Sequence, residues 1–120
     1  TGEGCAKSSS YFYLFFDEFW YDIYDEWSEV EYYTEDDEKY YEILDEFYYA
    51  HEAEFVSNYA ATNPGEDIAE SWAFFVTQPK PMGNTIADQK VLFFYQYPEL
   101  VNLRSEIIAR TYSRLVRIQR

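Results

Sequence analysis

The sequence predicts an all-α protein of about five helices, and three observations carry this prediction. Apolar residues recur at spacings of three and four along most of the chain, which is the period of a helix with one buried face. Residues that favour helix starts precede several of these runs. No segment alternates apolar and polar residues clearly, as a half-buried strand does. Residues 1–120 are therefore expected to form a single helical domain.

The first expected helix covers residues 11–27, after a small polar segment that ends in a cap at Ser9 or Ser10. Its wide aromatic stripe is typical of a helix packed in a core rather than of a binding site. The stripe consists of Phe12, Phe16, Phe19, Ile23 and Trp27.

An acidic loop is expected at residues 28–37, with Thr34 as the cap of a second helix over 36–49. The acidic run at 35–38 lacks the alternating ligands, central Gly and distal Glu of an EF-hand calcium loop. Acidic residues in a first helical turn are favoured by the helix dipole alone. The calcium interpretation is therefore not preferred.

A third helix is expected to begin after Asn63, which can cap it, with Pro64 at its first position and Glu66 where a capping-box acid would reach back. Its buried face would hold Ile68, Trp72, Phe75 and Val76. The segment 77–84 contains two Pro and a Gly, and it is the only candidate linker or hinge.

Two more helices are expected, one over 86–97 capped by Thr85 and closed by Pro98, and one over about 99–118. The last helix is amphipathic and rich in Arg. A basic amphipathic helix can lie on a membrane, but on an otherwise acidic protein we expect it to pack back on acidic neighbours of its own domain.

The chain is strongly acidic, with a formal net charge of −14, and an aromatic content of 22% excludes a disordered chain. The scarcity of Lys and Arg argues against nucleic acid and anionic membranes as partners. No apolar run has the length of a membrane span, so no membrane insertion is expected. Tyrosines, tryptophans and carboxylates suit a non-enzymatic acidic helical module that binds a basic protein.

The chain has one histidine and one cysteine. His51 is expected to bond a helix C-terminal carbonyl or to face solvent, in preference to a metal role, and Glu52 and Glu54 are expected to be solvated. Cys5 cannot form an internal disulfide, so it is either a free thiol or half of a bridge to sequence upstream.

Residues 59–76 are the only segment whose polar residues have spacings that chemistry would need. Glu66 and Glu70 would lie on one face of a helix, one turn from each other. Buried like charges repel, so a cation is expected beside them, and a metal with histidine ligands would use one Glu directly and the other to orient a histidine. Spacing alone favours a plainer interpretation, with Glu66 as a capping acid and Glu70 as a surface acid.

A longer pattern, Ser-x-Tyr-x-x-Thr-Asn-x-x-Glu-x-x-Ala-Glu-x-Trp, includes both glutamates. It is formed by Ser57, Tyr59, Thr62, Asn63, Glu66, Ala69, Glu70 and Trp72. This pattern resembles the second half of a zinc metallopeptidase of the gluzincin type. It is similar to zinc-binding metallopeptidases of bacterial cell surfaces and, more distantly, to the catalytic domain of anthrax lethal factor. Because of the resemblance, the metallopeptidase interpretation is preferred to the plainer one. The resemblance implies that the chain is the C-terminal part of a zincin-like domain. It also implies a location outside the cytoplasm and a disulfide bridge from Cys5 to sequence upstream.

The resemblance also implies residue roles: Glu66 as the third zinc ligand, Glu70 as the acid that orients a zinc-bound histidine, and Tyr59 as the hydroxyl that stabilises the oxyanion. The family's other two ligands come from an HExxH helix, which these 120 residues lack. Residues 51–55 begin like that motif, but Phe55 stands where the second histidine must be. We therefore expect an upstream HExxH helix to complete a peptidase acting on peptide or protein substrates. Alone, this piece is expected to be inactive, to bind no zinc and to self-associate through the face left uncovered.

Overall fold

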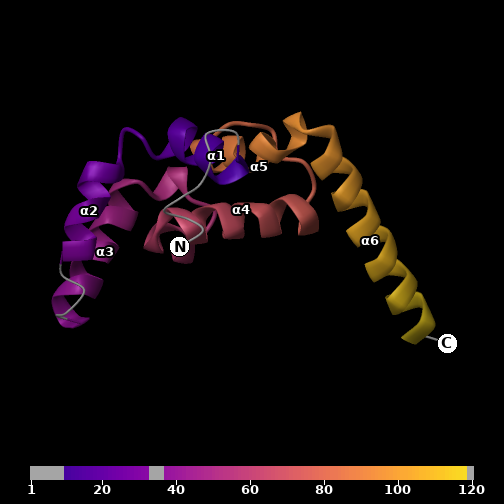
Figure 1. Ribbon diagram of the computed structural model, residues 1–120. Helices are drawn as coiled ribbons and strands as arrows, with labels where there is room; N and C mark the ends of the chain where they lie inside the picture. The colour runs from indigo at the N-terminus through magenta and orange to yellow at the C-terminus, as the bar shows by residue number, and fades with distance from the viewer. Residues whose placement is uncertain (1–9, 33–36, 119–120) are drawn as a thin grey trace.

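The computed structural model describes residues 10–32 and 37–118, and all regular structure in these residues is helical (Figure 1). The prediction of an all-α fold is therefore confirmed, and its place in a zincin-like domain stays a prediction. The described residues form six α-helices and three short 3-10 turns, in the order α1 Tyr11–Phe19, α2 Tyr24–Tyr32, α3 Asp37–Ala50, η1 Glu52–Glu54, η2 Tyr59–Thr62, α4 Pro64–Thr77, α5 Ile86–Phe93, η3 Phe94–Gln96 and α6 Pro98–Ile118.

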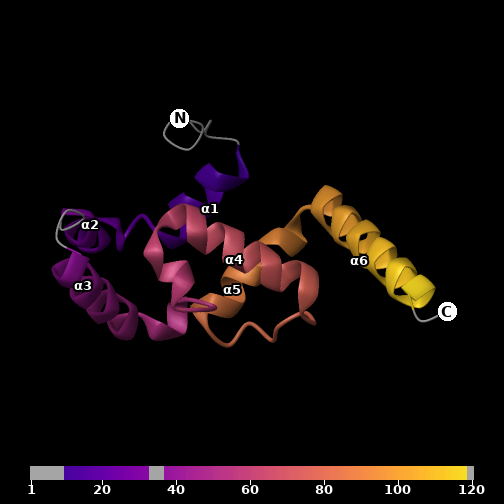
Figure 2. The ribbon, with the colours of Figure 1, turned by 90° about the horizontal axis from the view of Figure 1, so that it is seen from below.

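The helices form an arch. In Figure 1, α4 crosses the middle of the molecule, with α1 and α5 packed on one side of it. The α2–α3 hairpin and α6 leave the two ends of this body and project toward the same side. Figure 2, seen from below, places these two arms at opposite ends of α4. The longest dimension of the molecule is 51 Å.

Aromatic rings fill the core. Phe15 of α1 packs edge-to-face on Phe93 with ring centroids 5.4 Å apart, and Phe75 of α4 lies 5.4 Å from Phe94. Trp20 is fully buried and contacts Phe47 of α3 at 6.2 Å. Each such pair adds roughly 0.5–1.5 kcal/mol beyond the area that it buries. Trp20 therefore joins the core of the body to the core of the hairpin.

The single helix expected over 11–27 is wrong, because the chain turns between α1 and α2. Trp20 ends α1, and the N–H groups of Ile23 and Tyr24 both donate to the carbonyl of Trp20, at 3.1 and 2.9 Å. This turn lets α2 pack along α3 while Trp20 stays in the core. The loop expected from residue 28 is also wrong, since α2 continues to Tyr32 with Val30 buried.

The predicted helix starts are confirmed where the structure describes them. The side-chain oxygens of Ser10, Asn63 and Thr85 accept hydrogen bonds from the backbone N–H groups three residues later. Pro64 occupies the first turn of α4. The predicted cap at Thr34 and the predictions for Cys5 lie outside the described residues.

The helix expected over 86–97 ends earlier, and the chain tightens into η3 before Tyr97. Tyr97 is extended, with φ −109° and ψ 109°, because a residue that precedes a proline is disfavoured in helical conformation. The connection between α4 and α5 is fixed to α5, since Asp88 Oδ2 accepts from the N–H groups of Gly83 and Asn84 at 3.2 and 3.0 Å. Gly83 has φ +90°, a conformation that favours glycine.

The expectation that the basic C-terminal helix packs back on its own domain is wrong for most of α6. Only its first turns contact the body, where Arg104 Nε donates to the carbonyl of Phe75 at 2.6 Å. Beyond Arg104, α6 projects away from the body (Figure 1). No Gly or Pro interrupts residues 99–118, so nothing local turns the helix back. Among the helices described, none is long and apolar enough to cross a membrane.

Candidate functional site

The two glutamates of α4 lie as their spacing predicts. Glu66 lies in the first turn of α4 and Glu70 one turn later, and both are half-buried. Glu70 Oε1 accepts a hydrogen bond from Ser57 Oγ at 2.8 Å, and Ser57 Oγ accepts one from the N–H of Ala60 at 3.2 Å. The structure therefore brings Ser57 and Glu70 together and holds η2 against α4.

Tyr59 is the first residue of η2, directly before α4. Its side chain is exposed, whereas the next two residues, Ala60 and Ala61, are fully buried. In the part of the chain that the structure describes, no hydrogen bond or ion pair joins Tyr59 to Glu66 or Glu70. The buried alanines fix the turn, and the tyrosine ring faces outward from it.

The zinc-ligand set of the gluzincin pattern can be tested against the described residues. Within residues 10–32 and 37–118, no group of three or more His, Cys, Asp or Glu side chains is arranged to hold a metal ion. Glu66 lies near the cap of α4, and the only histidine is engaged elsewhere, by Glu26 and Glu54. These residues do not by themselves fit the two-histidine, one-glutamate set.

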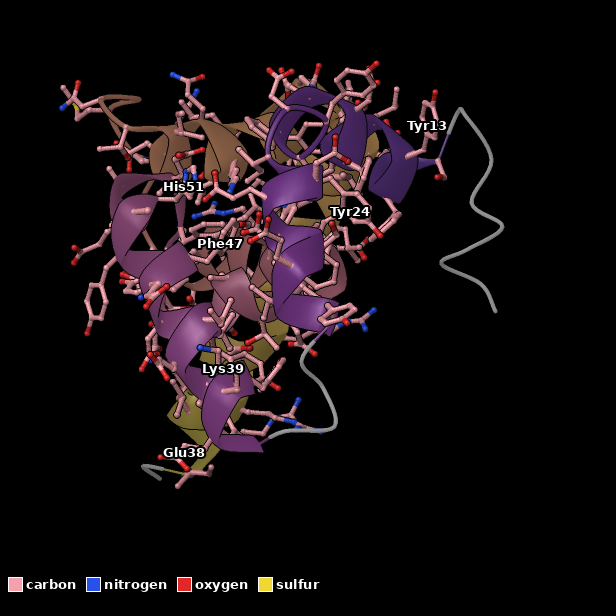
Figure 3. All side chains as sticks on the ribbon, turned by 90° about the vertical axis from the view of Figure 1, so that its left-hand side faces the viewer. Tyr13, Tyr24, Glu38, Lys39, Phe47 and His51 are labelled. Carbon is pink, nitrogen blue, oxygen red and sulfur yellow. The ribbon has the colours of Figure 1, made fainter. Side chains whose placement is uncertain are left out.

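His51 bridges the hairpin and the turn that follows it. Its Nε2 lies 2.7 Å from a carboxylate oxygen of Glu26 on α2, and its Nδ1 lies 2.5 Å from Glu54 of η1. Figure 3 shows His51 beside Phe47, with ring centroids 4.9 Å apart. Burial lowers the pKa of His51, but the hydrogen bonds to Glu54 and Glu26 together outweigh it and raise the pKa above its usual value. The expectations of a solvated Glu54 and of a carbonyl-bound or exposed His51 side chain are wrong, because the two residues pair.

A buried ion pair at the centre of the molecule was not expected from the sequence. Asp67 of α4 and Lys90 of α5 are both 0% exposed, and Lys90 Nζ lies 2.8 Å from Asp67 Oδ2. Trp20 Nε1 donates to the same oxygen at 2.8 Å. The sequence signal for Asp67 is its spacing, four and eight residues before Ser71 and Phe75, which are both buried on the same face of α4.

Lys90 also reaches the turn after the hairpin. Its Nζ donates to the carbonyl of Glu54 at 2.6 Å and lies 4.0 Å from the ring centroid of Phe55. Burial raises the pKa of Asp67 and lowers the pKa of Lys90, so each group needs the other to stay charged. These contacts join α4, α5 and η1, and the pair is fully buried among them.

The outward side of α3 carries a different set of residues, which we call the α3 outer face. All of its residues are exposed: Glu38, Tyr41, Glu42, Asp45, Glu46 and Tyr49. The helices α2 and α3 together contain nine acidic residues and one lysine. Tyr41 and Tyr49 are 62% and 69% exposed, although both are large and aromatic. Figure 3 shows the hairpin from this end of the molecule.

Comparisons with protein-family models, with curated proteins and with solved structures find no significant match to this chain. The metallopeptidase resemblance therefore stays a prediction, and the function has to be argued from the chain's own surfaces.

Proposed function

We propose that this chain is a helical protein-binding module whose α3 outer face binds a cationic segment of a partner. The observation that carries the proposal is the pair of exposed tyrosines, Tyr41 and Tyr49, set among four carboxylates on one helix face. Tyrosine supplies a large contact area at low cost in side-chain entropy, and it is enriched at binding hot spots. Carboxylates around it attract a basic partner and orient it.

The opposite side of α3 holds this face in place. Phe47 is buried, and Tyr40, Leu44 and Tyr48 are half-buried against the same core. His51 fixes the end of α3 to α2 through Glu26. The α3 outer face is therefore presented on a rigid element, which reduces the entropy lost when a partner binds.

The test is binding of a synthetic helical peptide made of leucine and arginine, measured by isothermal titration calorimetry. Replacing both Tyr41 and Tyr49 by Ser should weaken binding about tenfold or more, since truncating one hot-spot residue costs roughly 1–2 kcal/mol. Tyr21→Ser is the matched control, because Tyr21 is equally exposed but lies between α1 and α2. Equal loss in the control, or no loss in the double variant, would contradict the proposal.

The second candidate is the metallopeptidase part implied by the resemblance, and the Ser57–Glu70 hydrogen bond is the observation that favours it. This bond joins two residues of the pattern, and helix α4 itself sets Glu70 one turn from Glu66. In this proposal Glu66 is the third zinc ligand, Glu70 orients a histidine from an HExxH helix, and Tyr59 donates to the oxyanion of a peptide substrate. The two histidines would have to come from residues outside this sequence.

Zinc content of the complete gene product tests this second candidate. One bound zinc that is lost in Glu66→Ala and retained in Glu52→Ala would support it, because Glu52 is an exposed acid outside the pattern. A complete gene product that binds no zinc, or whose zinc survives Glu66→Ala, would remove Glu66 from the role of ligand.

A further inference from the structure

The outer half of α6 packs against no other helix among residues 10–32 and 37–118. Past Arg104, which contacts Phe75 and Tyr95, the helix extends for about another 20 Å at roughly 1.5 Å per residue. No other helix lies beside this half in Figure 1 or Figure 2. It still carries an apolar stripe at helical spacing, with exposed side chains of Ile108, Tyr112, Leu115 and Ile118. A lone helix of this length is marginal in water, so a partner that covers the stripe would stabilise it.

The charge of this half is opposite to that of the rest of the molecule. Arg110, Arg114 and Arg117 follow one another at spacings of four and three and line a shallow depression beside the stripe, together with Ile107. Glu106 is the only acidic residue between Arg104 and Ile118. The stripe is thus bordered by a row of cations, on a chain whose net charge is −14.

The α3 outer face has the complementary pattern. Glu38, Glu42 and Glu46 follow one another at intervals of four, so they form a row along one helix face that is opposite in sign to the arginine row of α6. Tyr41 and Tyr49 supply the apolar surface beside it. Two α6 helices would pair their stripes less well, because that arrangement brings two arginine rows together.

The α3 outer face of the same molecule is out of reach. In both ribbon views α3 and α6 lie at opposite ends of the arch (Figures 1 and 2). A second copy of the chain, related to the first by a two-fold axis, is therefore needed for α6 to reach this face, and the symmetry makes the pairing reciprocal.

We infer that α6 of one copy binds the α3 outer face of a second copy, reciprocally, in a two-fold dimer. The inference rests on the proposed function in one respect: it uses the same α3 outer face and names its partner as the basic helix of this chain. Each interface pairs the arginine row with the glutamate row and covers the α6 stripe with Tyr41 and Tyr49.

Charge reversal on each side, followed by mixing, tests this inference by analytical ultracentrifugation of the full chain. The first variant carries Arg110→Glu, Arg114→Glu and Arg117→Glu, and the second carries Glu38→Arg, Glu42→Arg and Glu46→Arg. Each variant alone should be monomeric where the unaltered chain is dimeric, with dissociation constants raised at least a hundredfold. An equimolar mixture should dimerise again, because both of its interfaces then pair opposite charges.

Folding is checked by circular dichroism, since all six positions are exposed and each single variant should keep its helix content. A chain that is monomeric at every concentration, a dimer that survives both sets of reversals, or a mixture that stays monomeric would overturn the inference. Binding of the unaltered chain to phosphatidylserine vesicles, in place of self-association, would also overturn it and assign α6 to a membrane surface.

The synthetic leucine-arginine peptide separates the two proposals. If the chain is monomeric but the peptide binds and requires Tyr41 and Tyr49, the proposed function stands and the dimer is wrong. If the chain dimerises through α6 and the peptide binds the monomeric α6 charge-reversal variant no better than it binds the double Tyr variant, the α3 outer face binds α6 alone, and the proposed function is wrong.

Discussion

The two arms of the arch differ in how they are stabilised. The α2–α3 hairpin has a core of its own, in which Trp27 and Phe47 are buried and Trp20 joins them to the body. The outer half of α6 has no such core, and its apolar side chains face solvent. Two helices that cover each other keep their shape without a partner, whereas a single amphipathic helix needs one. Both arms carry exposed aromatic or aliphatic residues, but only the hairpin presents them on a rigid support.

The largest effect is expected from breaking the ion pair that holds α4, α5 and η1 together. Lys90→Met leaves Asp67 buried without its cation and should lower the free energy of unfolding by about 3–5 kcal/mol. Chemical denaturation measures this loss, with the exposed Lys80→Met as the control. Adding Asp67→Leu to Lys90→Met should recover part of the stability. A loss below about 1 kcal/mol for the single variant would show that the pair does not hold α4, α5 and η1 together.

A pair of truncations compares the arms directly. Phe47→Ala empties a buried site in the hairpin and should cost about 3–5 kcal/mol of unfolding free energy. Leu115→Ala on α6 removes an exposed side chain and should change it by less than about 0.5 kcal/mol, measured at a dilution where the chain is monomeric. Similar losses of unfolding free energy in both variants would mean that Leu115 on α6 is packed to the same degree as Phe47 in the hairpin.

The bridge from His51 to Glu26 and Glu54 makes hairpin stability dependent on pH. His51→Gln should cost about 1–2 kcal/mol at pH 6, where the hydrogen bonds to both carboxylates are charge-assisted. Because the pKa of His51 is raised in the folded state, this stabilisation is fully present below the unfolded pKa of about 6.5.

The stabilisation is lost as pH rises through the folded pKa. Denaturation curves of both proteins at pH 5.5, 6.5 and 8, values chosen around the histidine range, should therefore show the difference shrinking with pH. A loss of unfolding free energy on His51→Gln that increases toward pH 8 would contradict a stabilising role for protonated His51.

The smallest effect is local to α6. Ala109→Gly should increase hydrogen exchange of the backbone amides after Arg104, because Gly costs a helix interior about 1 kcal/mol relative to Ala. The midpoint of global unfolding should not move, since this half of the helix is not packed on the body. Ala87→Gly in α5 is the comparison, because that helix belongs to the core and the same change should lower the midpoint.

Local chemistry made much of the fold predictable. The caps at Ser10, Asn63 and Thr85 follow from side chains that bond a backbone N–H three residues away, so the sequence alone indicates where three helices begin. The helical spacing of Glu66 and Glu70 likewise needs no tertiary information. These features depend on residues within one helical turn of each other.

The remaining features depend on residues far apart in the sequence. At the turn between α1 and α2, Trp20 bonds Asp67, which lies 47 residues later, and Lys90 meets Asp67 only where α5 packs on α4. The outward direction of α6 could not be predicted either. Its amphipathic pattern indicates that one face of the helix is to be buried, but it does not identify the surface that buries it. The sequence by itself determined the all-α class and the starts of α1, α4 and α5. Tertiary packing decided which charges are buried and which face of the molecule is left for a partner.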